Sequence, residues 1–138
     1  MKLPSDRHSE RLNVADITSR AYSYLGDAVF ELCVREYLVL ECGISDVQEL
    51  NDRAKEYVSA SSQAELMPLI SPLLTEDEDK VFRHARNKGH TPVSKNINAK
   101  QYRVATGLEA LFGYLYAEQR FDRIKELFAV ITKERSER

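Results

Sequence analysis

Apolar side chains recur every three or four residues through much of this chain, and glycine and proline seldom interrupt them. The pattern is clearest between about residues 16 and 40, where its members are Ile17, Ala21, Tyr24, Leu25, Ala28, Leu32, Leu38 and Val39. This spacing places apolar side chains on one face of an α-helix. Because 138 residues contain only five glycines, four prolines and no tryptophan, helices are favoured over strands joined by turns. We therefore predict an all-α fold.

Polar residues and prolines divide the first half of this pattern. Gly43 is expected to end the first helix. Ser45 is predicted to cap a second helix over about 46–60. A third helical segment spans about 61–74, and its two prolines should make its middle and its end irregular.

Cap signals also mark the helices of the second half. Thr75 and Glu78 have the spacing of a capping box, which predicts a helix from there to about Lys88. Asn98 is a candidate cap for a long apolar helix. Asp122 is the predicted cap of a terminal amphipathic helix.

The length of the chain fits one domain. We predict a polar flexible leader at 1–12, a single catalytic domain at 13–132 and a frayed tail at 133–138. No apolar run reaches the ~20 residues of a membrane span, and the first residues lack the apolar core of a secretory signal. Cys33 and Cys42 do not have the spacing of a metal site or a disulfide framework. These observations predict a cytoplasmic protein that does not associate with a membrane.

Two carboxylates stand alone in the two most apolar helical stretches. Asp27 is the only charged residue between Arg20 and Glu31, and Glu109 is the only one between Arg103 and Glu118. An ionised carboxylate on an apolar helix is costly unless a cation or hydrogen bonds compensate it. Two such groups far apart in sequence suggest one shared cation, as in a magnesium site for phosphate chemistry.

The basic residues are concentrated in one window. Between Lys80 and Leu108 there are seven lysines and arginines and no acid, whereas the rest of the chain carries a formal charge of -9. A cationic patch on an acidic body steers a polyanion to one face. The alternative is a solvated loop with ordinary surface lysines.

Two segments carry a family resemblance. Residues 24–29 (YLGDAV) and 109–113 (EALFG) resemble the two catalytic helices of ribonuclease III domains. Three further pairs make the resemblance closest to Mini-ribonuclease III, the short branch without a double-stranded-RNA-binding domain: Arg86-Asn87, Lys95-Asn96 and Tyr102-Arg103. The resemblance extends from about Asp16 to Phe128.

The resemblance implies an all-helical homodimer that cuts double-stranded RNA and leaves 5′-phosphate and 3′-hydroxyl ends. It implies that Asp27 and Glu109 are the catalytic acids and the ligands of Mg²⁺, with Mn²⁺ as the alternative metal. It also implies a ribosomal RNA precursor as substrate, specifically the ends of the large-subunit (23S) RNA. A ribosomal protein that presents this RNA is a candidate further partner.

Larger ribonuclease III enzymes have two more carboxylates, at the positions that Ser23 and Thr106 occupy here. We expect these hydroxyls to lie around the metal rather than on it. Glu31, one turn after Asp27, has the same expected place, with a plain surface or interface role as the alternative. Tyr24 matches the family position whose ring enters a pocket of the other subunit, and an intramolecular core aromatic is the alternative.

Contacts to RNA are expected from basic and amide side chains on both sides of the loop before the second acidic helix. A-form RNA presents phosphates and 2′-hydroxyls across its shallow minor groove, which these side chains can bind. The predicted RNA-binding residues are Arg86, Asn87, Lys88, Lys95, Asn96, Lys100 and Arg103.

Two other functions compete with the nuclease. A non-catalytic RNA-binding or ribosome-assembly protein on the same fold would explain the basic window, but it has no use for negative charge facing phosphate. A helical dimerisation module would explain the aromatics and glycines, but not the window without acids.

Overall fold

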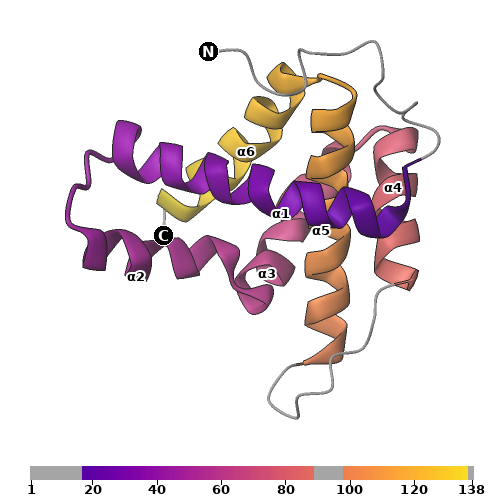
Figure 1. Ribbon diagram of the computed structural model, residues 1–138, viewed down its shortest axis with the longest axis horizontal. Helices are drawn as coiled ribbons and strands as arrows, with labels where there is room; N and C mark the ends of the chain where they lie inside the picture. Colours follow the sequence, from indigo (N-terminus) through magenta and orange to yellow (C-terminus); the bar gives the residue numbers. More distant parts are fainter. Residues whose placement is uncertain (1–16, 89–97, 137–138) are drawn as a thin grey trace.

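The computed structural model describes residues 17–88 and 98–136, and each element in these ranges is helical (Figure 1). The predicted all-α class is confirmed. Residues 1–12 lie outside the described ranges, so the division into leader, domain and tail stays a prediction. The elements are α1 (Ser19–Glu36), η3 (Tyr37–Glu41), α2 (Val47–Val58), α3 (Ala60–Ile70), η4 (Ser71–Leu73), α4 (Glu76–Lys88), α5 (Ala99–Ala117) and α6 (Phe121–Ser136).

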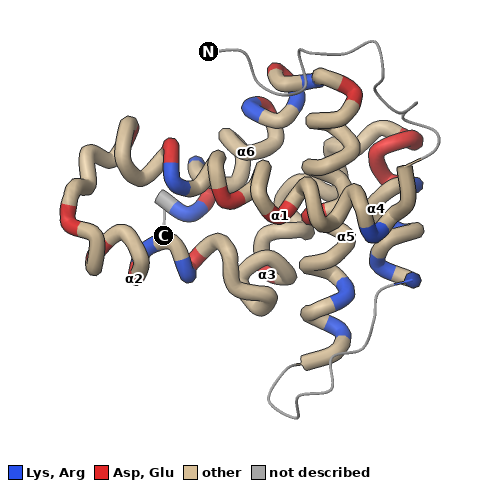
Figure 2. The backbone as a smooth tube through the Cα atoms, viewed as in Figure 1, with Lys and Arg blue, Asp and Glu red and all other residues tan. Residues whose placement is uncertain are grey.

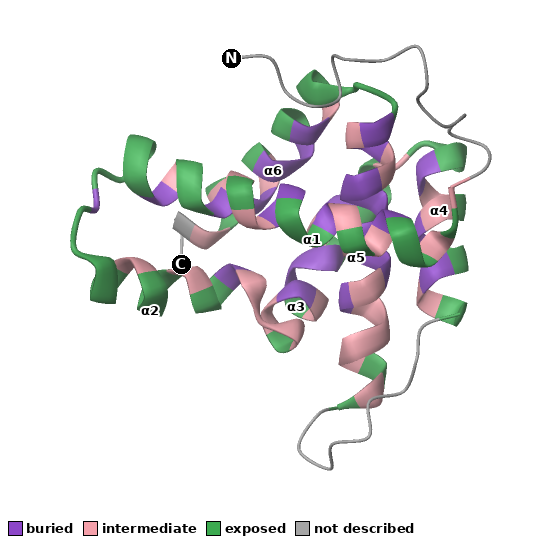
Figure 3. Cartoon of the chain, in the orientation of Figure 1, coloured by how far each residue is buried: buried purple, intermediate pink, exposed green. Residues whose placement is uncertain are grey.

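The long helix α5 is the centre of the fold. Helices α1, α3, α4 and α6 all pack against it, and α1 crosses it (Figure 1). A helix with neighbours on several sides must be apolar around most of its circumference. This explains why α5 is buried from Ala105 onward apart from four partly buried positions (Figure 3).

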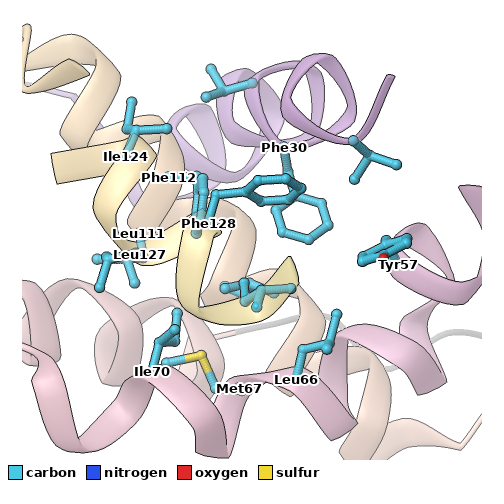
Figure 4. Packing of buried hydrophobic residues seen from close by; sticks show 14 of the residues in the cluster. Phe30, Tyr57, Leu66, Met67, Ile70, Leu111, Phe112, Ile124, Leu127 and Phe128 are labelled. Atoms are coloured by element: carbon cyan, nitrogen blue, oxygen red, sulfur yellow. The ribbon is translucent and has the colours of Figure 1, made fainter. Parts of the chain in front are cut away.

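Aromatic side chains join three of these helices in the core. The ring of Phe30 on α1 contacts the rings of Phe112 on α5 and Phe128 on α6 edge to face, with centroids 5.2 and 5.8 Å apart (Figure 4). Leu66, Met67 and Ile70 of α3 lie on the other side of this cluster (Figure 4). Burial of such side chains contributes about 1.5–3 kcal/mol each.

The first helix stops at the predicted glycine, but its last turn is a π-helix that the sequence pattern did not predict. After Glu36 the chain widens into a π-helix, in which the Cys42 N–H donates to the Tyr37 carbonyl at 2.9 Å. Gly43 follows with φ of 68°, a left-handed conformation that glycine adopts without cost, and the predicted stop is confirmed. The predicted cap Ser45 is wrong, because Asp46 caps α2 by accepting from the Glu49 N–H at 2.9 Å.

For the later helices, the predicted effects of proline and the predicted cap Asn98 are confirmed, whereas the predicted cap of the last helix is wrong. Pro68 lies within α3, and the next turn is a 3₁₀-helix. The Asn98 side chain accepts from the Gln101 N–H at 3.1 Å at the start of α5. The cap predicted for the last helix is wrong, because α6 begins at Phe121 and Asp122 lies within its first turn.

The predicted capping box between Thr75 and Glu78 is confirmed and has a second role. Each residue's backbone N–H donates to the side chain of the other, at 2.9 and 3.2 Å. The Glu78 carboxylate is fully buried and accepts two hydrogen bonds from the Arg123 guanidinium, at 2.8 and 2.9 Å. Arg123 also donates to the Leu73 carbonyl at 2.7 Å. The start of α4 is thereby fixed to α6.

Within the described ranges, no helix combines the length and the apolar character that crossing a bilayer requires.

Candidate active site

Two buried glycines allow α1 and α5 to touch through their backbones. A Cβ atom on Gly26 would overlap the carbonyl oxygen of Glu109 and lie 2.5 Å from its carbonyl carbon. A Cβ on Gly113 would overlap the carbonyl oxygen of Tyr22 and lie 2.9 Å from the Gly26 nitrogen. Only glycine fits at both positions, and this contact places Asp27 of α1 beside Glu109 of α5.

The two isolated carboxylates therefore meet. The pKa of Glu109 is raised to about 8, first by burial and then by the charge of Asp27 and a hydrogen bond between the two carboxyls. A hydrogen bond from the Gln63 side chain opposes this shift, and the charge of Glu31 adds to it. Two carboxyls this close retain a proton between them unless a cation takes its place.

The pair lines a cavity of about 240 Å³ between α1, α4 and α5. The Ser23 hydroxyl donates to the Thr106 carbonyl at 2.9 Å, and the Thr106 hydroxyl donates to the Tyr102 carbonyl at 3.0 Å. Both hydroxyl protons are thus directed at the backbone, which leaves the oxygen lone pairs available as acceptors. Arg20 and Lys88 also line the cavity.

The oxygen atoms that line this cavity fit a hard divalent cation. The side chains that converge are carboxylates and hydroxyls, which are the ligands that Mg²⁺ and Mn²⁺ take. A cation would also relieve the repulsion that raises the pKa of Glu109. The described residues contain no group of three or more acidic, histidine or cysteine side chains placed to hold a metal. A cation held by these two carboxylates would keep coordination positions for water or for substrate oxygens.

Comparison with known proteins decides the family. A family model for the ribonuclease III domain matches residues 20–120, a range that contains both carboxylates and both glycines of the helix crossing. The chain belongs to the ribonuclease III family. Ribonuclease III membership makes it an endoribonuclease that acts on double-stranded RNA.

Curated relatives narrow the branch of the ribonuclease III family to Mini-ribonuclease III. Mini-ribonuclease 3 of Enterococcus faecalis is 44% identical over 110 residues, which are 78% of this chain and 82% of the relative. Mini-ribonuclease 3 of Symbiobacterium thermophilum is 43% identical over 106 residues, 76% and 80% of the two chains. The crystal structure of protein FN1578 from Fusobacterium nucleatum is similar with a TM-score of 0.77 and 26% identity, covering 88% of this chain and 97% of that one.

Glu31 and Tyr24 were each predicted to have one of two roles, and the structure shows where both side chains lie. Glu31 is partly buried and forms an exposed ion pair with Arg35 at 3.4 Å, while its charge still reaches Glu109. Tyr24 lines the carboxylate cavity, but 86% of its surface is exposed. The alternative of an intramolecular core aromatic is therefore wrong for Tyr24.

The predicted RNA-binding residues occupy two places. Lys88 lines the carboxylate cavity, whereas four others line a second cavity of about 390 Å³ between α4 and α5. The four are Arg86, Asn87, Lys100 and Arg103. Lys95 and Asn96 lie outside the described residues. Arg103 therefore lines the second cavity, and it is not among the residues that line the cavity of Asp27 and Glu109.

Sequence reasoning missed Gln63 and Arg20. Gln63 is 2% exposed on α3 and hydrogen-bonds Glu109. Its sequence signal is a polar residue at the start of an apolar face that continues with Leu66, Met67 and Ile70 at i+3, i+4 and i+7. In the sequence, Arg20 only marked the start of the stretch in which Asp27 is the single charge. In the structure it lines the cavity, one helical turn before Tyr24.

Proposed function

We propose that Asp27 and Glu109 together bind one divalent cation, Mg²⁺ with Mn²⁺ as the alternative, and that double-stranded RNA is hydrolysed there. The observation that carries the proposal is the contact of these two carboxyls at a cavity whose rim is cationic. Their hydroxyl neighbours, Ser23 and Thr106, orient water around the cation through their oxygen lone pairs.

A bound divalent cation makes a water more acidic and neutralises charge on the leaving oxygen. The chain's own residues do the rest. Asp27 and Glu109 fix the cation's position, and Gln63 holds the ionised Glu109 carboxylate in one orientation. Arg20 and Lys88 attract the phosphate that must approach two negative side chains. Glu31 acts through its charge on Glu109 rather than as a ligand.

RNA contacts are proposed on both sides of the loop between α4 and α5. The cavity lined by Arg86, Asn87, Lys100 and Arg103 lies on the α4–α5 wall, and phosphates or 2′-hydroxyls of a duplex fit its donors. Lys95 and Asn96 extend this set in sequence. Because such contacts read the backbone, substitution of Lys100 by alanine should weaken binding and flatten its salt dependence.

We also propose that two copies form a C2 dimer through the exposed face of α1. Tyr24, Ala28 and Leu32 are one turn apart on this helix and all exposed, with Tyr24 at 86% and Leu32 at 63%. An apolar stripe of this kind is typical of an interface. Two symmetry-related sites would each cut one strand of a duplex. Sedimentation equilibrium should give a dimer, and Tyr24→Asp should give a monomer.

The proposed substrate is a ribosomal RNA precursor, at the ends of the large-subunit RNA, in the cytoplasm, and the proposed further partner is a ribosomal protein that presents it. Support comes from the curated relatives, which are named Mini-ribonuclease 3. The non-catalytic alternative is not favoured, because these relatives are named as ribonucleases.

The test is digestion of a long RNA duplex by the purified protein with Mg²⁺, beside a single strand of the same sequence. We expect cleavage of the duplex alone, with products that carry a 5′-phosphate and a 3′-hydroxyl. Binding of the duplex without cleavage would contradict the proposal and favour the non-catalytic protein.

A further inference from the structure

A cationic groove adjoins the carboxylate cavity and shares no lining residue with the cavity of Lys100 and Arg103. Its volume is about 790 Å³, and its walls are the start of α1 and the exposed face of α4. Figure 2 shows basic segments on both helices where the start of α1 lies beside α4. None of the described residues that line the groove is acidic.

Three side chains of α4 form a row along this groove. Lys80, His84 and Lys88 are four residues apart, so they lie on one face of the helix, and all three are exposed. The row is about 12 Å long, from the helical rise per residue. This length spans more than one phosphate of an RNA strand.

Among the described residues, no acid forms an ion pair with the cations of the groove, Arg20, Lys80 and Lys88. By contrast, Arg83 on the same helix pairs with Asp79 at 2.8 Å and does not line the groove. Unpaired cations around a hollow without acids fit a polyanion.

The groove and the carboxylate cavity share part of their walls. Ser19, Arg20 and Lys88 line both. A strand with one phosphate at Asp27 would therefore have its neighbouring phosphates led past Arg20 and Lys88 into the groove. The floor is apolar, with Ile17 and Val81 packed against the small core cluster, and it suits the sugar faces of a backbone.

We propose that this groove binds phosphates of the RNA strand that flank the cleaved bond, with Lys80 and His84 as contacts remote from the chemistry. The inference rests on the proposed nuclease function and adds residues that the sequence analysis did not assign to RNA. It predicts that the groove contributes to binding and to its salt dependence, and leaves the chemical step unchanged.

The test compares Lys80→Gln/His84→Gln with the wild type and with Arg83→Gln, the matched control on the same helix. Duplex RNA binding is measured in EDTA across 50–200 mM salt, and cleavage is measured with Mg²⁺. We expect the double variant to bind roughly 5–10-fold more weakly at the lowest salt, with a log–log salt slope reduced by about 1. Its KM should rise by a similar factor at constant kcat, and Arg83→Gln should match the wild type.

Several results would overturn the inference. If the wild type binds and cleaves but the double variant behaves as Arg83→Gln does, the groove is not part of the RNA site while the nuclease function stands. A lower melting temperature with unchanged RNA binding would mean that the groove holds a segment of the protein itself. If the wild type fails to bind duplex RNA even at the lowest salt, both the groove and the proposed function are wrong.

Discussion

Substitution of Gly26 by alanine should separate the two carboxylates by moving one helix away from the other. The added Cβ would lie 2.5 Å from the Glu109 carbonyl carbon, whereas carbon atoms pack without strain at about 3.5 Å. The obstacle is backbone inside a buried helix, so no side chain can rotate away. Helix α1 must retreat from α5 by at least about 1 Å at this point, because the Glu109 carbonyl oxygen is even closer to the new Cβ than the carbonyl carbon.

Two opposing terms set the size of the effect. Alanine is a better helix former than glycine and would stabilise α1 by ~1 kcal/mol. Overpacking typically costs 1–3 kcal/mol, and contact with backbone puts this case near about 3 kcal/mol. The net loss of about 2 kcal/mol should lower the melting temperature by roughly 8 °C. A displacement of about 1 Å at the chemistry should lower kcat by about 10²-fold.

The assay is thermal unfolding at fixed protein concentration together with duplex cleavage. Gly113→Ala acts at the same crossing and should lose similar stability, because its Cβ would overlap the Tyr22 carbonyl oxygen. Ala129→Gly, at an exposed site of α6, supplies the scale for helix propensity alone, a loss of about 1 kcal/mol. If Gly26→Ala melts at or above the wild-type temperature with full activity, the close crossing does not position the carboxylates.

Four further outcomes follow from buried groups. Arg123→Met should destabilise the fold by about 3–5 kcal/mol, because the buried charge of Glu78 would lose its closest partner and keep only Arg120 at 4.0 Å; a urea titration measures the loss. Burial alone would raise the pKa of Glu78, but its hydrogen bonds and Arg123 lower it, so its contribution is complete above the unfolded carboxyl pKa of 4.5 and disappears as the pH falls through the lower folded value. In acid titrations monitored by circular dichroism, the Glu78→Gln variant should have a lower free energy of unfolding than the wild type, and this difference should shrink as the pH falls below 4.5. A difference that stays constant with pH would refute this. Gln63→Leu removes a hydrogen bond that lowers the pKa of Glu109, so the acid limb of the pH–rate profile should move to higher pH, and an unmoved limb would exclude this role. Burial, with the charge of a nearby acid, raises the pKa of Cys33 to about 11, so at pH 8 iodoacetamide should modify it about 10²-fold more slowly in the folded protein than in urea, and equal rates would contradict that burial.

Local chemistry was readable from the sequence where one short segment contains all the interacting groups. The capping box of Thr75 and Glu78 is complete within four residues, and both of its hydrogen bonds are present. The ion pair of Glu78 with Arg123 could not be predicted in this way, because the two residues are 45 positions apart in the sequence. The capping-box pattern gives no sign that the carboxylate is also fully buried.

The candidate site was likewise predictable where the sequence signal is local, and not where it depends on how the helices pack. The isolation of Asp27 and Glu109 in apolar helices predicted that they share a cation, and the structure places them in contact. The backbone contact at Gly26 needs the crossing of two helices, which no local pattern specifies. The position of Gln63 on the apolar face of α3 could be predicted from the periodicity. Its hydrogen bond to Glu109 could not, because it depends on the packing of α3 on α5.

The cap of α2 shows the limit of propensity alone. Serine and aspartate have similar preferences for the N-cap position, so adjacent Ser45 and Asp46 could not be ranked from sequence. The backbone decides, since Asp46 is extended and its side chain reaches the Glu49 N–H. The π-helical turn after α1 contains Leu38, which is 1% exposed and belongs to the core.

The central claim is that Asp27 and Glu109 together form the metal site of a nuclease. Its most direct test is cleavage of a long RNA duplex across a Mg²⁺ titration by the wild type, Asp27→Asn and Glu109→Gln. Glu36→Gln is the matched control, an exposed acid on the same helix as Asp27. We expect both site variants to bind the duplex but to lose cleavage by roughly 10³-fold or more at every Mg²⁺ concentration, while Glu36→Gln equals the wild type. Cleavage that survives in both site variants would contradict the claim.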